Sequence, residues 1–240
     1  MVTKGIALRF KEDYADEIKF AKSHNFDFFQ VWFYNGELCA NSLSEPREIK
    51  IKEHGFPIII HAAFDINDFE KHGQRLLELV EFFGHSEVII HPVCTSETIT
   101  EKTVFTLAKK LDLIYEKLEK RDVKLYVENN STIDGFFNSV EDLRVVFDNN
   151  TNFGLLIDLA HINDYDHLIN IVKMRRPECI HIADKRFGVP HEHLTLGKGD
   201  LDFHMIFRDI IPDFDGRIIL EAVKTKNGVA KSKGIIDRLF

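Results

Sequence analysis

Eight short segments of the chain are apolar at consecutive positions and are rich in Ile, Val, Leu and Phe. They span residues 4–10, 27–32, 57–63, 87–93, 124–129, 154–160, 179–185 and 217–223. Consecutive apolar residues, rather than alternating ones, are typical of strands whose two faces are both covered. The pattern therefore predicts eight buried strands.

The segments between these runs are longer, and their apolar residues recur near the 3.6-residue period of an amphipathic helix. The clearest examples span 65–84, 100–121 and 139–149. Asp65, Thr100 and Ser139 are predicted N-caps, because their side-chain oxygens can accept from the free N–H groups of a first helical turn. Gly84 is predicted at a helix C-terminus, where the left-handed conformation favours glycine.

Strands that alternate with helices predict βαβ units and a parallel sheet. Eight such strands close a (β/α)₈, or TIM, barrel, and we predict this fold as a single domain over residues 1–240. An open doubly wound sheet is the alternative, but it would be expected to have a glycine-rich phosphate loop after an early strand. The segment GKGD at 197–200 comes late in the chain and follows no predicted strand.

The composition is that of an ordinary globular protein, with 44% hydrophobic and 29% charged residues. There are 31 Lys and Arg against 39 Asp and Glu, and the resulting net charge of −8 disfavours binding to nucleic acid or an anionic membrane.

No apolar run reaches the roughly 18 residues of a membrane-spanning helix, and the first residues lack a signal peptide's apolar stretch. Three widely spaced cysteines suit a reducing compartment. We expect a cytoplasmic location and no membrane partner; the sequence contains no indication of oligomeric state.

Six successive apolar runs, the third to the eighth, each have one acid–base or metal-competent side chain near the C-terminal end. These residues are His61, His91, Glu128, Asp158, His181 and Glu221. In a parallel barrel the C-terminal ends of all strands lie on one face. Side chains spread over much of the sequence are therefore expected to converge at one mouth.

The chemistry of this set indicates a divalent cation. Carboxylates and imidazoles are ligands that Zn²⁺ and Mn²⁺ both accept. Burying Glu128, Asp158 and Glu221 together without a cation would place three like charges in a poorly solvated site, which is unfavourable. The sequence therefore predicts a metal-binding site formed by the strand ends.

These residues and the motifs around them resemble the xylose isomerase-like TIM barrels. That group includes sugar and sugar-phosphate isomerases and epimerases, and also the endonuclease IV type of abasic-site nuclease. The motifs are VENN (127–130), IDLAHI (157–162), IHIADK (180–185), HLTLGKGDLDF (193–203) and ILEAV (219–223). The group's D-x-x-H step is present as Asp158 and His161. The resemblance covers nearly the whole chain and is clearest from the third strand to the eighth.

For the isomerase and epimerase branch, the resemblance implies one divalent ion, Zn²⁺ or Mn²⁺. Its ligands would be Glu128, Asp158, His181 and Glu221. The ion would polarise the carbonyl of a keto sugar or sugar phosphate, while Glu128 and Glu221 remove and return a proton through an enediolate. His161 would hold a substrate oxygen. A basic residue after the seventh strand, Lys185 or Arg186, would help to bind the substrate, with an exposed charge at the rim as the alternative.

For the endonuclease branch, the resemblance implies two or three metal ions and a nucleic-acid substrate. The additional ligands would be His61, His91, His161, His191 and His193. His191 stands where an Asp is expected, but imidazole also binds zinc. Counting back from the G-x-G at 197–199 gives this register. The endonucleases have an Asp-x-His pair just before the G-x-G. Matching the string HEH instead would make His191 the His of that pair and put Val189 in place of the Asp, so both registers of the 184–201 loop stay open.

A small-molecule substrate is favoured over DNA. The net charge opposes a polyanion, and only the segments 33–45, 92–99, 129–138 and 184–201 are long enough to shape a site. The apolar stretch 28–34 would place Trp32 or Phe33 at the pocket wall, with packing in the core or rim as the alternative. Two other classes remain: a metal-dependent hydrolase of small phosphoesters, and an inactive barrel that binds a ligand or partner. The intact ligand set argues against the inactive barrel.

Overall fold

Eight parallel strands close into a barrel in the computed structural model, which describes all residues except 8–12, 39–46, 85, 149, 151 and 222–223. The strands are β1 (Thr3–Ala7), β2 (Phe28–Tyr34), β4 (Ile58–Asp65), β5 (Glu87–Val93), β6 (Lys124–Glu128), β7 (Gly154–Asp158), β8 (Cys179–Ile182) and β9 (Arg217–Leu220). Strand β1 pairs in parallel with both β9 and β2, which closes the ring. The predicted (β/α)₈ barrel is confirmed, and the open doubly wound sheet is wrong.

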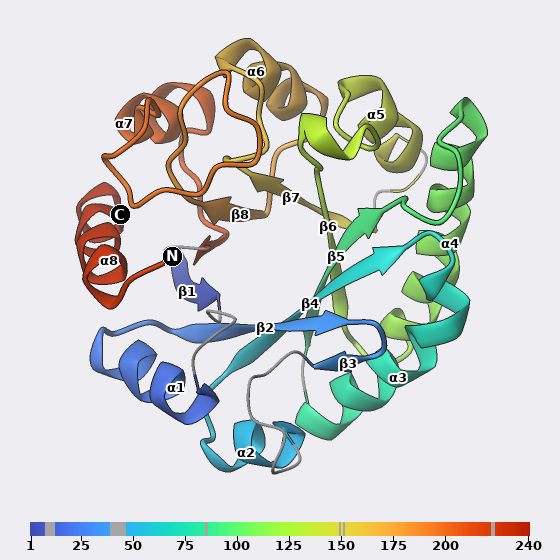
Figure 1. Ribbon diagram of the computed structural model, residues 1–240, viewed down its shortest axis with the longest axis horizontal. Helices are drawn as coiled ribbons and strands as arrows, with labels where there is room; N and C mark the ends of the chain where they lie inside the picture. Colours follow the sequence, from blue (N-terminus) through green and yellow to red (C-terminus); the bar gives the residue numbers. More distant parts are fainter. Residues whose placement is uncertain (8–12, 39–46, 85, 149, 151, 222–223) are drawn as a thin grey trace.

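Helices surround the barrel on its outside, and the chain alternates between strand and helix around the ring (Figure 1). They are α1 (Tyr14–Ser23), α2 (Arg47–Glu53), α3 (Asp68–Phe83), α4 (Glu101–Glu119), α5 (Val140–Phe147), α6 (Tyr165–Met174), α7 (Phe203–Met205) and α8 (Lys226–Leu239). A π-helical turn, η2 (Ile206–Ile210), follows α7, a short 3₁₀ turn, η1 (Thr132–Asp134), precedes α5, and β3 (Glu37–Leu38) forms a hairpin with the end of β2. No helix in the described part of the chain is both long and apolar enough to span a membrane.

The predicted helix ends are mostly confirmed. Thr100 and Ser139 are the N-caps of α4 and α5, and Gly84 ends α3 with a left-handed φ of 68°. The prediction for Asp65 is wrong, because this residue ends β4 and Asn67 is the N-cap of α3. The Asp65 carboxylate instead accepts hydrogen bonds from the loop that follows β5.

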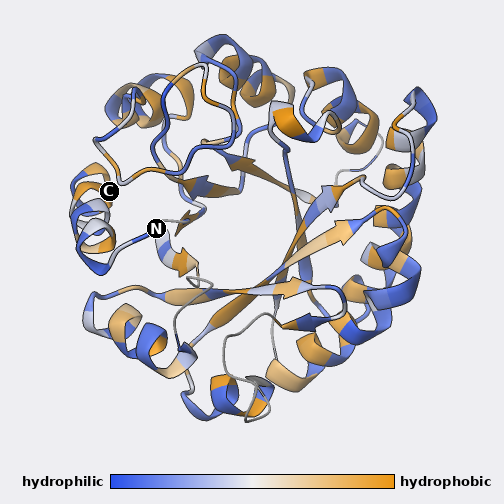
Figure 2. Cartoon of the chain, in the orientation of Figure 1, coloured by the Kyte–Doolittle hydropathy of each residue, from blue (hydrophilic) through white to orange (hydrophobic). Residues whose placement is uncertain are grey.

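The barrel encloses an apolar layer that is separate from the main core between strands and helices. The helices turn their hydrophobic faces toward the strands (Figure 2). Inside the barrel, the layer consists of Ala7, Phe28, Ile59, Ile89, Tyr126, Leu156, Cys179 and Ile219. Successive residues of a strand point to opposite faces, so the residue two positions later points inward again. For β4 to β9 that residue is one of the six predicted strand-end side chains, which places all six in one layer above the apolar one.

A buried carboxylate organises the long loop after β8. The Asp184 Oδ2 atom accepts hydrogen bonds from the backbone N–H groups of Gly197, Lys198 and Gly199 at 2.8–2.9 Å, and Oδ1 accepts from two further N–H groups. A Cβ on Gly199 would lie 2.2 Å from the Lys185 carbonyl oxygen, so only glycine fits there. The G-x-G of this segment therefore binds a carboxylate of its own chain and brings the 184–201 loop over the mouth.

We expect Asp184→Ala to destabilise the protein by about 3 kcal/mol, because it leaves several buried N–H groups without an acceptor. The free energy of unfolding in urea measures this loss. Asp213→Asn, at an exposed turn with φ of 54° that Asn tolerates, is the control and should change stability little. Equal stability of the two variants would show that the Asp184 network does not hold the loop.

Candidate metal centre

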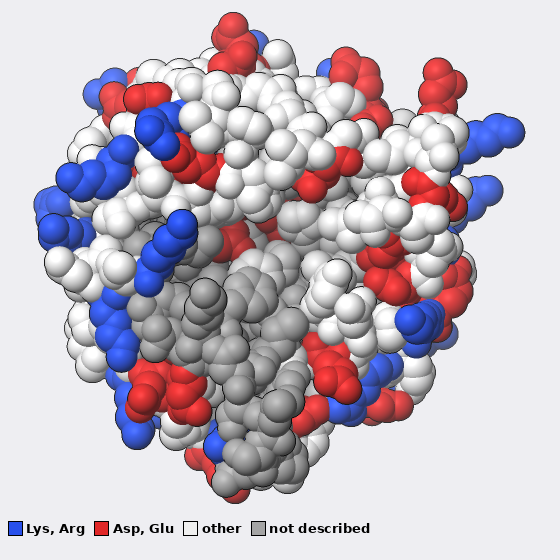
Figure 3. All heavy atoms as spheres, viewed as in Figure 1, with Lys and Arg blue, Asp and Glu red and all other residues white. Residues whose placement is uncertain are grey.

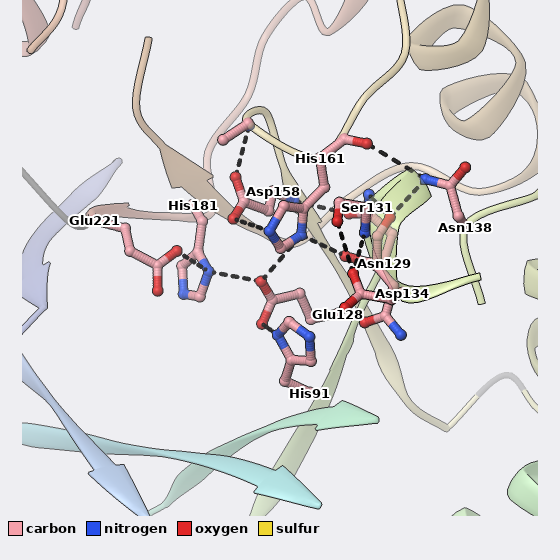
Figure 4. A network of polar contacts seen from close by, with 12 residues as sticks. His91, Glu128, Asn129, Ser131, Asp134, Asn138, Asp158, His161, His181 and Glu221 are labelled. Atoms are coloured by element: carbon pink, nitrogen blue, oxygen red, sulfur yellow. Dashed lines mark hydrogen bonds and ion pairs between the residues drawn. The ribbon is translucent and has the colours of Figure 1, made fainter. Parts of the chain in front are cut away.

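The six predicted strand-end side chains converge at the C-terminal mouth of the barrel. Glu128 lies at the centre, and Figure 4 shows it with His91, Asp158, His181 and Glu221. The Glu128 Oε2 atom lies 2.6 Å from His61 Nε2 and 3.1 Å from His91 Nδ1. Its Oε1 atom lies 3.1 Å from His181 Nδ1. One carboxylate from β6 therefore contacts imidazoles from β4, β5 and β8.

The two other carboxylates complete the cluster from β7 and β9. Glu221 Oε2 lies 2.8 Å from His181 Nδ1. Asp158 Oδ2 lies 3.2 Å from His161 Nε2 and 3.3 Å from His193 Nε2. Asp158 Oδ1 accepts from the backbone N–H of Ala160, which directs Oδ2 into the site.

The donor atoms fit a divalent cation. One ligand atom from each of Glu128, Asp158, His181 and Glu221 lies within 4.8 Å of the others, and all four side chains are buried. This set of one imidazole and three carboxylates suits Zn²⁺ or Mn²⁺. Three further groups of donors overlap with it: His61–His91–Glu128, Asp158–His161–His193 and His61–His181–Glu221.

Protonated histidines balance the carboxylates when no ion is bound. Burial favours the neutral carboxylic acid, but the surrounding imidazoles outweigh it and hold the pKa of Glu128 well below its usual range. Burial also disfavours charged His181, yet Glu221 and Glu128 raise its pKa well above the ordinary value. A cation would replace these protons, so metal binding is expected to release protons.

The pKa values of four further histidines around the cluster are shifted in different directions. Burial opposes protonation of His193, but Asp158 outweighs it and raises the pKa of His193 to about 9. Burial likewise opposes protonation of His91, and Glu128 raises its pKa. Burial lowers the pKa of His61 and of His191. The His191 ring stacks on His161 with centroids 4.8 Å apart, and it belongs to none of the donor groups.

Asn129, directly after β6, and Asn138, shortly before α5, position the site from behind, a role that the sequence pattern did not predict. His161 Nδ1 lies 2.9 Å from the Asn129 carbonyl oxygen and donates to it, which directs Nε2 toward Asp158. The Asn129 side-chain oxygen accepts from the backbone N–H of Asp158 at 2.8 Å. Asn138 donates to the carbonyl oxygens of Asn130 and His161 (Figure 4). The signal in the sequence was the pair of amides in VENN, which are polar residues in a buried position.

A cavity of about 430 Å³ opens above the cluster. Described residues that line it are Trp32, Phe33, Tyr34, His61, Ala63, His91, Val93, Glu128, Asp158, His161, His191, His193 and Glu221. The lining therefore combines apolar side chains with the donor cluster. The Trp32 ring packs edge-on against His61, with centroids 4.4 Å apart. Acidic side chains are visible in the middle of this face, and most Lys and Arg side chains lie toward its edge (Figure 3).

Neither basic residue proposed for substrate binding lines the cavity. Lys185 is buried, and its Nζ donates to the Ile162 carbonyl oxygen at 2.6 Å. Arg186 is exposed and forms an ion pair with Glu192. The Asp184 carboxylate accepts from the Lys185 backbone N–H and so fixes the backbone here, while both basic side chains bind partners that do not line the cavity. The expectation that Lys185 or Arg186 contacts the substrate has no support in this arrangement.

Comparison with known proteins identifies similar folds. A family model described as xylose isomerase-like TIM barrel matches residues 18–239, and no curated protein matches the chain. A D-tagatose 3-epimerase-like protein superposes with a TM-score of 0.79 at 20% identity, covering 99% of this chain and 96% of that one. D-allulose 3-epimerase from Methylomonas, in complex with D-allulose, has a TM-score of 0.75 at 12% identity and coverages of 100% and 97%. The IOLI protein with a bound zinc atom has a TM-score of 0.73 at 14% identity and coverages of 99% and 96%.

The His193–Asp158 pair predicts that the metal-free protein loses stability in alkali. The pKa of His193 is raised to about 9 in the folded chain, against about 6.5 when unfolded. This stabilisation is present below the unfolded value and is lost as the pH rises through the folded one, by at most about 3 kcal/mol. Urea unfolding of chelator-treated protein between about pH 6 and 10 measures it. We expect His193→Gln to flatten this slope and His204→Gln, at an exposed position, to keep it. A wild-type stability that is constant over this range would contradict the prediction.

Proposed function

The chain belongs to the family of xylose isomerase-like TIM barrels, and from this premise we propose that it is a divalent-metal-dependent sugar isomerase or epimerase. The observation that supports the proposal most directly is the buried set of three carboxylates and one imidazole at the floor of the cavity. Two of these carboxylates, Glu128 and Glu221, approach the same nitrogen of His181 at 3.1 and 2.8 Å. The cluster therefore offers ligands for a cation and two acid–base groups beside them.

The residues of the cluster divide between holding the cation and moving a proton. Glu128, Asp158, His181 and Glu221 would hold the ion. When bound, a divalent ion would polarise a substrate carbonyl and acidify the neighbouring carbon-bound proton. Glu128 and Glu221 both line the cavity, so one carboxylate removes that proton and the other returns it. Return to the same carbon from the other side gives an epimer, and return to the neighbouring carbon of the enediolate gives an isomer.

His161 would hold a substrate oxygen. Its Nδ1 is bound to the Asn129 carbonyl oxygen and its Nε2 lies beside Asp158, and the residue is part of the cavity lining. A fixed ring orientation of this kind preorganises a polar contact before the substrate arrives.

The cavity favours an unphosphorylated sugar over a sugar phosphate. Trp32, Ala63 and Val93 form an apolar wall against which the C–H face of a sugar could pack, whereas Phe33 is completely buried in the core. No lysine or arginine is present among the described residues of the lining, and such residues usually bind phosphate. The similar D-allulose 3-epimerase was solved with D-allulose, a sugar without phosphate.

A multinuclear zinc phosphodiesterase, acting on abasic DNA or a small phosphoester, is the second candidate. The observation in its favour is that His61, His91 and Glu128 form one further donor group, and Asp158, His161 and His193 form another. Two or three ions could then activate water for attack on phosphorus. The net charge of −8 opposes binding of a polyanion, so we rank this function second.

We expect Glu221→Gln and Glu128→Gln each to reduce turnover by about a thousandfold or more, because each removes an acid–base group. The assay measures incorporation of solvent deuterium into a panel of ketoses and their phosphates by mass spectrometry, with Mn²⁺ or Zn²⁺ added. Unphosphorylated ketoses should exchange faster. Glu97→Gln, at an exposed position in the loop after β5, is the control and should retain activity. Full activity in either cluster variant, with the fold intact by circular dichroism, would exclude the two-glutamate mechanism.

Elemental analysis of untagged protein, purified without chelator, distinguishes the two candidates. We expect about one ion per chain, held by the four-residue set. His91→Ala should then weaken substrate binding but keep that ion, because His91 lies outside the set. Two or three zinc ions per chain, with one lost in His91→Ala, would instead support the phosphodiesterase.

A further inference from the structure

A buried amide on β2 contacts the cluster from behind. Gln30 and His181 are both completely buried, and Gln30 Oε1 lies 2.8 Å from His181 Nε2. The other ring nitrogen, Nδ1, faces Glu128 and Glu221. The two nitrogens of His181 therefore have separate tasks, and Gln30 engages the one that points away from the carboxylates.

The position of Gln30 follows from the inward alternation of β2. Phe28 belongs to the apolar layer inside the barrel, and Trp32 lines the cavity. Gln30 lies between these two inward positions and is paired with Ile59 of β4 and Ala7 of β1. It does not line the cavity, so it can act on bound substrate only through another residue.

We propose that Gln30 is a positioning residue that fixes the ring and tautomer of His181 for metal binding. This inference rests on the proposed function, since it requires a cation at the cluster. A neutral imidazole has one N–H and one lone pair. An amide oxygen beside Nε2 stabilises the proton on that nitrogen and leaves the lone pair on Nδ1, toward the two glutamates. Groups that orient a ligating histidine in this way raise its basicity and its metal affinity.

The presence of a polar side chain at the completely buried position 30 supports a role in the site. The Gln30 Nε2 atom is buried and has no hydrogen-bond partner in the described part of the chain. A buried donor without a partner is unfavourable, and an apolar side chain of similar volume would avoid that cost. The hydrogen bond from His181 Nε2 to Gln30 Oε1 offsets this cost.

The test compares two substitutions at position 30 with one at position 28. Gln30→Met keeps the length of the side chain and removes the acceptor, whereas Gln30→Glu keeps an acceptor. Phe28→Leu alters packing on the same strand and the same inward face without contacting this hydrogen bond. The Zn²⁺ dissociation constant is measured by competition with a chromophoric chelator, on protein whose fold is checked by circular dichroism.

We expect Gln30→Met to weaken Zn²⁺ binding by about 10- to 100-fold, Gln30→Glu to bind Zn²⁺ at least as tightly as the wild type because a carboxylate is the stronger acceptor, and Phe28→Leu to stay within about threefold of the wild type. Equal affinity of Gln30→Met and wild type would overturn the inference and leave the proposed function intact. An equal loss in Gln30→Met and Phe28→Leu would also overturn it, because packing would then explain the effect. A wild-type chain that binds no Zn²⁺ or Mn²⁺ would overturn the proposed function itself.

A measurement on the wild type tests the same inference without relying on the folding of a variant. In the zinc-loaded protein, ¹⁵N NMR of the histidine rings reports which nitrogen of His181 has the proton. We expect a proton on Nε2 and zinc on Nδ1. Zinc on Nε2 would break the contact with Gln30 and overturn the proposal.

Discussion

Three carboxylates buried in one layer of a closed barrel are the constraint on which the rest of the mouth depends. Glu128, Asp158 and Glu221 are at most 4% exposed. Like charges at such depth repel strongly unless positive groups lie among them. Five imidazoles approach these carboxylates within 3.3 Å, those of His61, His91, His161, His181 and His193, and a divalent ion would supply positive charge with fewer groups. The same excess of buried negative charge that requires nearby imidazoles would therefore also favour binding of a metal ion.

Barrel geometry makes this cluster possible. Inward positions alternate along every strand, so an apolar residue and the polar residue two positions later occupy successive layers. Ile59 precedes His61 and Tyr126 precedes Glu128 in this way. The lower layer excludes water from below, and the upper layer forms the floor of the cavity. One repeated local pattern therefore produces both the core and the site.

Hydrogen bonds from buried polar side chains hold the cluster in its geometry. Asn129 orients His161 and anchors the backbone of Asp158. Asp184 gathers the backbone of the 197–199 turn and so brings His193 over the mouth. Gln30 holds the far side of His181. These residues do not contact a substrate in the cavity, yet each determines where a contacting group lies.

The sequence by itself determined the eight strands, the barrel and the six strand-end side chains. These features depend on local patterns: runs of apolar residues, and a polar residue two positions after an inward-facing one. Such patterns can be recognised without knowing which segments meet in the folded chain. Only the tertiary structure decided which groups meet. It paired Gln30 with His181 across 151 residues, and it moved the predicted cap Asp65 to the end of β4. It also gave Lys185 and Arg186 partners that do not line the cavity. Such contacts depend on closure of the barrel and on how loops are anchored, and a linear pattern does not specify either.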